Sequence, residues 1–231
     1  LVCAVFMATA LALMLSSPVP RATRQLDPAT LETIFAGVIF NWQRKLLLGA
    51  LSLDLVAGLL GGATALLPIF AKDVLHVGPW GLGLLRGAPA VGALLTSLVL
   101  ARWPPGRKVG AKMMGAVVAY GLCMLVFAYS TVLAVSLLAL ALSGVADMVN
   151  VVVRQTLVQS ETPDAMRGRV SAVNSIFIGA SNQLGEFESG MTAAWWGAIG
   201  SVAVGGMATL AVAALWLKLF PQLARRDRMG H

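Results

Sequence analysis

Residues 132–156 read VLAVSLLALALSGVADMVNVVVRQT, and this segment decides the fold. It is long enough to cross the hydrocarbon core of a bilayer, which takes about 20 residues of helix. Polar residues recur within it at steps of four, three and four, which places them on one stripe of a helix: Ser143, Asp147, Asn150 and Arg154. Ionisable side chains inside a span are costly, so this stripe indicates a protein-lined or water-filled interior.

Apolar residues dominate the rest of the chain as well. Of 231 residues, 58% are hydrophobic and 12% are charged. A soluble domain is about one-quarter charged, so the composition argues against a soluble enzyme or a nucleic-acid-binding module. The two cysteines and two histidines are scattered, and no nucleophile elbow or metal-ligand spacing occurs. We therefore predict no enzyme activity, no metal and no cofactor.

Apolar runs separated by short polar connectors predict an all-α integral membrane protein with six complete spans and the end of a preceding one. The predicted spans are 1–17, 46–70, 80–101, 109–129, 132–156, 170–192 and 197–219. The chain starts with Leu1 inside an apolar run, so we interpret residues 1–17 as the end of a helix that begins upstream. A signal peptide is the competing interpretation, but the run lacks a basic leader, and cleavage would invert every later loop.

The connector 18–45 contains apolar residues at helical spacing: Leu31, Ile34, Phe35, Val38, Ile39 and Trp42. This pattern predicts a short amphipathic helix. Such a helix lies either on the membrane surface or against other protein, and the sequence leaves both open. The spans of 46–219 form one bundle, and 220–231 form a tail.

Basic residues give the orientation. Fifteen of the 17 Lys and Arg residues lie in or beside the connectors 18–45, 102–112 and 154–169 and the tail, whereas Lys72 and Arg86 do not. By the positive-inside rule this side, including the C-terminus, is cytoplasmic. The net charge of +7 then follows from topology and requires no nucleic acid.

A second polar stripe runs along 170–192. Its members recur at three to four residues: Ser171, Asn174, Ser175, Asn182, Gln183, Glu186 and Ser189. Two helices with polar stripes would together line an aqueous or substrate-lined path through the membrane. The spans 109–129 and 197–219 lack interior acidic residues, so we expect them to face lipid. Gly83 and Gly87 form a small-xxx-small pair that predicts close helix packing.

Each buried charge has a structural alternative to a role in transport. Arg86 can snorkel to the interface or pair with Glu186 or Glu188. Asp147 lies two helical turns from Arg154, about 10.5 Å along the axis, which is too far for an easy direct pair. Asp147 can instead pair with a basic loop residue and lock helices together. Asp54 is a further candidate within the second span.

Several motifs point to a known family. They include RQTL at 154–157, TPDAMRGRV at 162–170 and GASNQLGE at 179–186, with LPIFA at 67–71 and APAVGALL at 88–95. Together they resemble the C-terminal half of major facilitator superfamily transporters. Within that superfamily the chain is most similar to the bacterial exporter branch that includes the enterobactin exporter.

The resemblance implies a twelve-helix fold of two halves. Residues 1–17 would end the sixth helix of a missing N-terminal half, 18–45 would form the central cytoplasmic loop, and 46–219 would supply helices seven to twelve. In the superfamily a charged cytoplasmic loop acts as a latch. The equivalent loop 101–108 reads ARWPPGRK and lacks the family's aspartate. Asp147 is then the acidic partner, with Arg107, Arg154 or Arg167 as its mate.

Together with the polar stripes, the resemblance implies a proton-driven exporter of small organic molecules, siderophore or drug-like, in the bacterial inner membrane. Its partners would be the lipid bilayer, protons, a small substrate and the other half. The gate or ion-pair candidates are Asp147, Arg154, Arg107, Arg167, Arg169 and Asp164. The lining or proton-coupling candidates are Asp54, Arg86, Asn150, Asn174, Asn182, Gln183 and Glu186. The alternative is a non-transporting scaffold, whose polar stripes would be buried against partner helices.

Overall fold

A computed structural model describes residues 9, 11–13, 16, 39, 42, 44–61, 63–103, 109–163 and 166–219. The chain divides into two units, Leu1–Thr30 and Leu31–His231. In the first unit the described residues include one helical turn, where the Ser16 hydroxyl donates to the Leu13 carbonyl at 3.0 Å. The predicted boundary at 17 lies outside the described residues, whereas the one at 45 coincides with the start of a long helix at Lys45.

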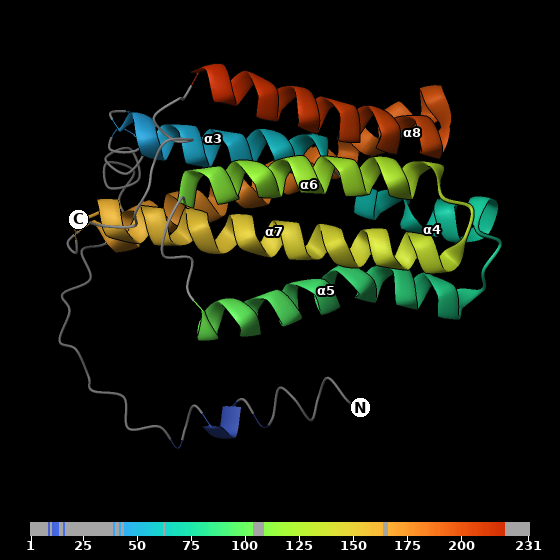
Figure 1. The fold of residues 1–231 in the computed structure, drawn as a ribbon, viewed down its shortest axis with the longest axis horizontal. Helices are drawn as coiled ribbons and strands as arrows, with labels where there is room; N and C mark the ends of the chain where they lie inside the picture. Colours follow the sequence, from blue (N-terminus) through green and yellow to red (C-terminus); the bar gives the residue numbers. More distant parts are fainter. Residues whose placement is uncertain are drawn as a thin grey trace. The chain divides into compact units, whose positions relative to one another are not determined.

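The second unit is a bundle of long helices (Figure 1). Its elements are α3 (Lys45–Leu60), η1 (Ala63–Leu66), α4 (Leu67–Ile69), η2 (Phe70–Val74), α5 (Pro79–Arg102), α6 (Val109–Tyr129), α7 (Leu133–Glu161) and α8 (Arg167–Leu219). Five stretches are long and apolar enough to cross a membrane. The described residues contain no strand. The all-α membrane fold is therefore confirmed, as expected where only internally hydrogen-bonded backbone is stable in lipid.

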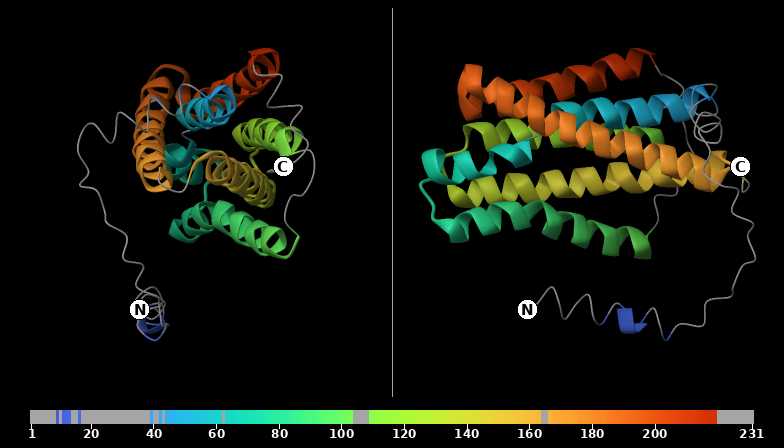
Figure 2. Two further views of the ribbon diagram at one scale, coloured as in Figure 1. Left: turned by 90° about the vertical axis from the view of Figure 1, so that its left-hand side faces the viewer. Right: turned by 180° about the vertical axis from the view of Figure 1, so that it is seen from behind.

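The helix α8 is two helices joined at Gly197. This glycine has φ 72° and ψ 168°, a backbone conformation that side-chain-bearing residues rarely adopt. The chain turns back there, and 167–196 crosses α3 obliquely (Figure 2). A break between the sixth and seventh predicted spans is thus confirmed. The fifth span is longer than predicted, since α7 continues to Glu161.

The second predicted span, 46–70, is interrupted. α3 ends at Leu60 with Gly61 as its cap, and the chain continues as a 3-10 turn, a short α-helical turn and a π-helical turn as far as Val74. The physical reason is the glycine pair at 61 and 62, since glycine is a poor helix former. The Tyr120 hydroxyl donates to the Gly61 carbonyl at 3.1 Å and so satisfies a group near the break.

Close packing of α5 on α7 depends on two glycines. A Cβ atom at Gly144 would lie 2.0 Å from the Pro89 carbonyl oxygen, and one at Gly92 would lie 1.9 Å from the Ala141 carbonyl oxygen. Gly83 and Gly87 mediate no such contact within the described part of the chain, because no described atom lies within 4 Å of a Cβ built on either. Glycine spacing alone does not tell which face of a helix meets a neighbour.

The expectation that 109–129 faces lipid holds only for part of its surface, since this span also packs inside the bundle and lines its cavity. α6 packs on both α7 and α8 and buries Met113, Val117 and Phe127. Phe127 stacks on Phe70 with ring centroids 4.6 Å apart, beside the break after α3. An apolar sequence therefore does not distinguish a helix that faces lipid from one that packs inside the bundle.

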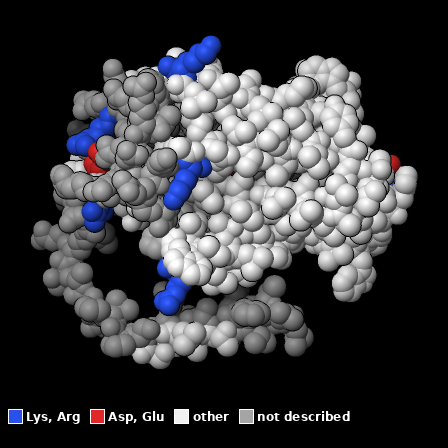
Figure 3. Space-filling model, viewed as in Figure 1, with Lys and Arg blue, Asp and Glu red and all other residues white. Residues whose placement is uncertain are grey.

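Most basic residues of the described part, with Lys72 and Arg86 as exceptions, lie toward one end of the bundle. α5 ends at Arg102, α7 ends near Glu161, and α8 both begins and ends at the same end (Figure 1). On the face drawn in Figure 3, Lys and Arg side chains gather toward this end, and a broad uncharged surface covers the middle. The charge distribution is that of a bundle with an apolar belt, as a membrane requires.

Candidate functional site

A cavity of about 490 Å³ opens within the bundle between α3, α5, α6, α7 and α8. All four members of the α7 stripe line it: Ser143, Asp147, Asn150 and Arg154. The side that carries these residues is fixed by the packing of α7, whose other faces meet α5 and α6. The predicted stripe therefore does face an interior space.

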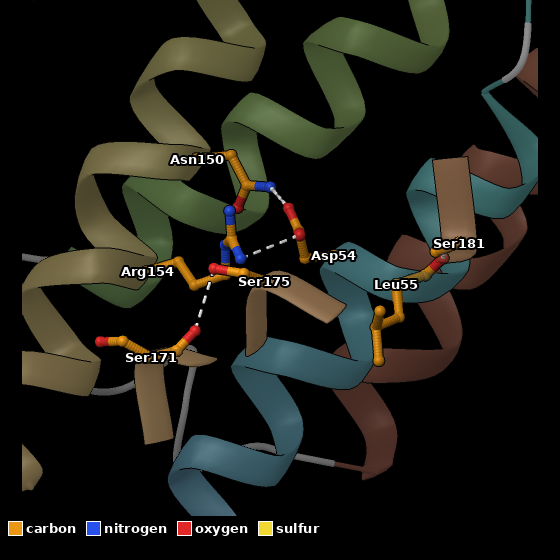
Figure 4. A network of polar contacts seen from close by, with 7 residues as sticks. All are labelled: Asp54, Leu55, Asn150, Arg154, Ser171, Ser175 and Ser181. Carbon is orange, nitrogen blue, oxygen red and sulfur yellow. Dashed lines mark hydrogen bonds and ion pairs between the residues drawn. The ribbon is translucent and has the colours of Figure 1, made fainter. Parts of the chain in front are cut away.

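An ion pair joins α3 to α7 in this cavity (Figure 4). Arg154 Nη1 lies 3.2 Å from Asp54 Oδ2, and the two side chains are only 6% and 13% exposed. Asn150 Nδ2 donates to the other carboxylate oxygen, Asp54 Oδ1, at 2.8 Å. Asn150 and Arg154, one helical turn apart on α7, thus each bind one oxygen of the Asp54 carboxylate on α3.

This pairing differs from the expected one. Arg154 was one of three candidate mates of Asp147, beside Arg107 and Arg167, but it pairs with Asp54 on a neighbouring helix. The distance along α7 between Asp147 and Arg154 explains the difference, because a side chain on the adjacent helix reaches the guanidinium more easily. Asp147 has no ion pair with any residue that the structure describes, and its side chain is exposed on the cavity wall.

Two polar atoms of the network remain unsatisfied. Among the described residues, neither Asn150 Oδ1 nor Arg154 Nε has a hydrogen-bond partner, although both atoms are buried. Both residues are 5% exposed and line the cavity. Buried polar atoms are normally paired, so unpaired atoms in a cavity wall indicate a place where another molecule donates or accepts.

Tyr120 also lines the cavity, and no sequence pattern predicted this position. Its ring comes from α6, and its hydroxyl reaches the Gly61 carbonyl at the break after α3. A Cβ atom at Gly61 would lie 2.8 Å from this hydroxyl, so the glycine makes room for the contact. A lone tyrosine in an apolar run carries no periodic signal, and only the fold reveals its role.

The polar stripe of 170–192 does not act as one surface. Asn182 and Glu186 line the cavity, both exposed, whereas Gln183 is exposed but does not line it. Asn174 lies instead on a separate apolar groove of about 140 Å³ between α3 and α8. Ser181 is buried against α3, where its hydroxyl donates to the Leu55 carbonyl (Figure 4).

The remaining candidates lie away from the cavity. Arg86 is exposed on α5, and it pairs with neither Glu186 nor Glu188 in the described part of the chain. Arg167 donates to the Gln159 and Thr162 carbonyls at 3.2 and 3.3 Å, closing the turn between α7 and α8. Arg169, near the start of α8, does not line the cavity either.

Some expectations fall on residues that the structure does not describe. They are Arg107, Asp164 and most of the predicted amphipathic helix, of which only Ile39 and Trp42 are described, both exposed. The structure adds a pair that the sequence did not predict. Arg44 Nη1 lies 3.4 Å from Glu161 Oε2 and joins the start of α3 to the end of α7.

Comparison with known proteins gives one match. No curated protein and no solved structure matches the chain. A family model described as transmembrane secretion effector, of the major facilitator type, matches residues 2–229. That range includes the whole bundle and every residue of the cavity. The chain therefore belongs to the transmembrane secretion effector family of major facilitator transporters.

Proposed function

We propose that the chain forms the C-terminal half of a secondary transporter that exports small organic molecules, siderophore or drug-like, using the proton gradient. The family supports export in general terms. The observation that carries the proposal is the charged cavity inside an apolar bundle. A span keeps costly ionisable groups where a substrate or ion path needs them.

The Asp54–Arg154 pair suggests how access alternates. It bridges α3 and α7 across the cavity, and both side chains are nearly buried. Breaking a buried pair costs most when water is excluded, and water that enters with an opening cavity lowers this cost. We assign the pair as a contact that exists in one state of the transport cycle and opens in the other, taking over the gate role expected for Asp147.

Orientation belongs to the same proposal. The basic end of the bundle would face the cytoplasm of a bacterium, with the C-terminus on that side and a second six-helix half completing the site. Glu186 is the proposed proton carrier, because it is a cavity carboxylate with no ion pair among the described residues. An unpaired carboxylate gains and loses a proton without disrupting a structural contact.

The experiment compares Glu186→Gln with Glu188→Gln in the intact protein. Glu188 lies two residues away and does not line the cavity, so it is a matched control. Inverted vesicles with an imposed pH gradient are offered fluorescent cations and anions, and their uptake is followed. We expect gradient-driven uptake to fall at least about tenfold in Glu186→Gln and to persist in Glu188→Gln. Unchanged uptake in Glu186→Gln removes the proton role, and no uptake of any probe by the unaltered protein removes the transport function.

A scaffold without transport remains the alternative, and cysteine labelling separates the two. A cysteine at Asn182 should react with a water-soluble maleimide, because this position lines the cavity. A cysteine at Ser181 should not, because this hydroxyl is buried against α3. Equal protection of both positions in the assembled protein favours the scaffold.

A further inference from the structure

We infer that the cavity selects organic cations over organic anions, which narrows the substrate class of the proposed transporter and rests on that proposal. Its charged lining residues in the described ranges are Asp54, Asp147, Glu186 and Arg154. The described cavity lining therefore contains three carboxylates and one guanidinium. Because Arg154 is committed to Asp54 at 3.2 Å, the charges of Asp147 and Glu186 are left to act on whatever enters.

An unpaired hydrogen-bond acceptor in the cavity wall also favours a cationic ligand. Asn150 is 5% exposed, and its Oδ1 atom has no partner within the described part of the chain although the residue lines the cavity. An ammonium N–H of a bound molecule can satisfy this acceptor, whereas a carboxylate or phosphate cannot. The other unpaired atom, Arg154 Nε, belongs to a guanidinium whose charge Asp54 already balances.

The uncharged walls define the body of the ligand. They carry apolar side chains such as Leu67, Met124 and Ile178, with the ring of Tyr120 among them. The volume of about 490 Å³ lies within the range of about 300–1,000 Å³ that is typical of sites for drug-sized molecules. The preferred ligand is thus an amphiphilic cation, with an apolar body and a positive centre near Asp147 and Glu186.

The cavity disfavours an anion for the same reason. A negatively charged molecule of equal size would approach two carboxylates without a counter-ion, in a site where partial exclusion of water strengthens repulsion. This argues against multiply anionic ligands such as catecholate siderophores, which the family resemblance alone leaves possible.

Equilibrium binding to the purified intact protein tests the charge preference without any gradient. The probes are tetraphenylphosphonium and tetraphenylborate, which share size and shape and differ in the sign of charge. Empty detergent micelles give the background for each probe. We expect the phosphonium to bind at least about tenfold more tightly than the borate, as a difference in electrostatic interaction of this kind predicts.

Variants locate the preference. Asp147→Asn and Glu186→Gln should each weaken phosphonium binding several-fold relative to the unaltered protein. Asp147→Glu, which keeps the negative charge, and Glu188→Gln, which lies outside the cavity, should both bind the phosphonium as the unaltered protein does. Size-exclusion profiles check that each variant is folded. Equal binding of both probes, no binding of the phosphonium, or unchanged binding in Asp147→Asn and Glu186→Gln overturns the inference. Because binding is measured without a gradient, these outcomes are distinct from the absence of transport.

Discussion

The helix α7 is held in two different ways on its two sides. Against α5 the contact is backbone to backbone, with Gly144 beside the Pro89 carbonyl and Gly92 beside the Ala141 carbonyl. Against α3 the contact is a bridge of side chains, in which Arg154 and Asn150 hold Asp54 at the edge of a cavity. The first contact leaves no space between the helices, and the second spans one.

The difference shows which contact can change during a transport cycle. Close-packed backbone has no low-energy rearrangement, because any shift opens a void or creates a clash. A side-chain ion pair can separate by rotamer changes, and water can replace each partner. We therefore expect α5 and α7 to move together, and the α3–α7 bridge to be where the states differ.

Removing one partner of the bridge should have the largest effect. In Arg154→Met, Asp54 loses its counter-ion in a site where its side chain is only 13% exposed. Leaving one charge of a buried pair uncompensated costs about 3–5 kcal/mol. Thermal unfolding of the intact protein in detergent should show a markedly lower midpoint.

The double variant Asp54→Asn with Arg154→Met is the control for this effect. It removes both charges, so most of the lost stability should return. If the single and double variants unfold at the same temperature, the two residues are not coupled, and the bridge is not a stabilising contact.

Filling the close contact between α5 and α7 should have the next largest effect. In Gly144→Val the new side chain meets the Pro89 backbone, since even a Cβ atom there would lie 2.0 Å from its carbonyl oxygen. Overpacking of this kind costs about 1–3 kcal/mol. Gly115→Val on α6 is the matched control, because no described atom lies within 4 Å of a Cβ at that glycine. A lower unfolding midpoint is expected for Gly144→Val alone, and equal midpoints would show that α5 and α7 are not packed through their backbones.

The hydrogen bond of Tyr120 should give the smallest effect. Tyr120→Phe keeps the ring and removes the donor to the Gly61 carbonyl, at a cost of about 0.5–1.5 kcal/mol. Tyr129→Phe is the control, because that side chain is 70% exposed at the end of α6. A difference in unfolding midpoint between the two variants measures the contact, and identical midpoints would assign no stabilising role to it.

The sequence predicted the helical class and the α7 stripe because both depend on local periodicity. Ser143, Asp147, Asn150 and Arg154 share a face in any helix, and the cost of burying them in lipid fixes where that face must point. The break at Gly61 was missed because an uninterrupted apolar run looks the same whether or not a glycine pair ends the helix within it.

The partner of Arg154 could not be predicted in the same way. Asp54 and Arg154 lie 100 residues apart, and their meeting depends on how α3 and α7 are placed by the rest of the bundle. Tyr120 and Gly144 are further cases, since each contacts a backbone carbonyl that belongs to another part of the chain. Local sequence patterns identify which residues share a face of a helix, and only the tertiary packing shows which residues of other helices that face contacts.

The turn at Gly197 affects how the last two helices can enter a membrane. Across it the Thr192 and Ser201 hydroxyls lie 2.7 Å apart, and Ser201 Oγ donates to the Ser189 carbonyl at 3.1 Å. No charged residue lies between 189 and 218. A hairpin that inserts as a unit would therefore lead with a tip free of charged side chains, in which the Thr192 and Ser201 hydroxyls are already paired, and Glu186 and Glu188 would follow on its first arm.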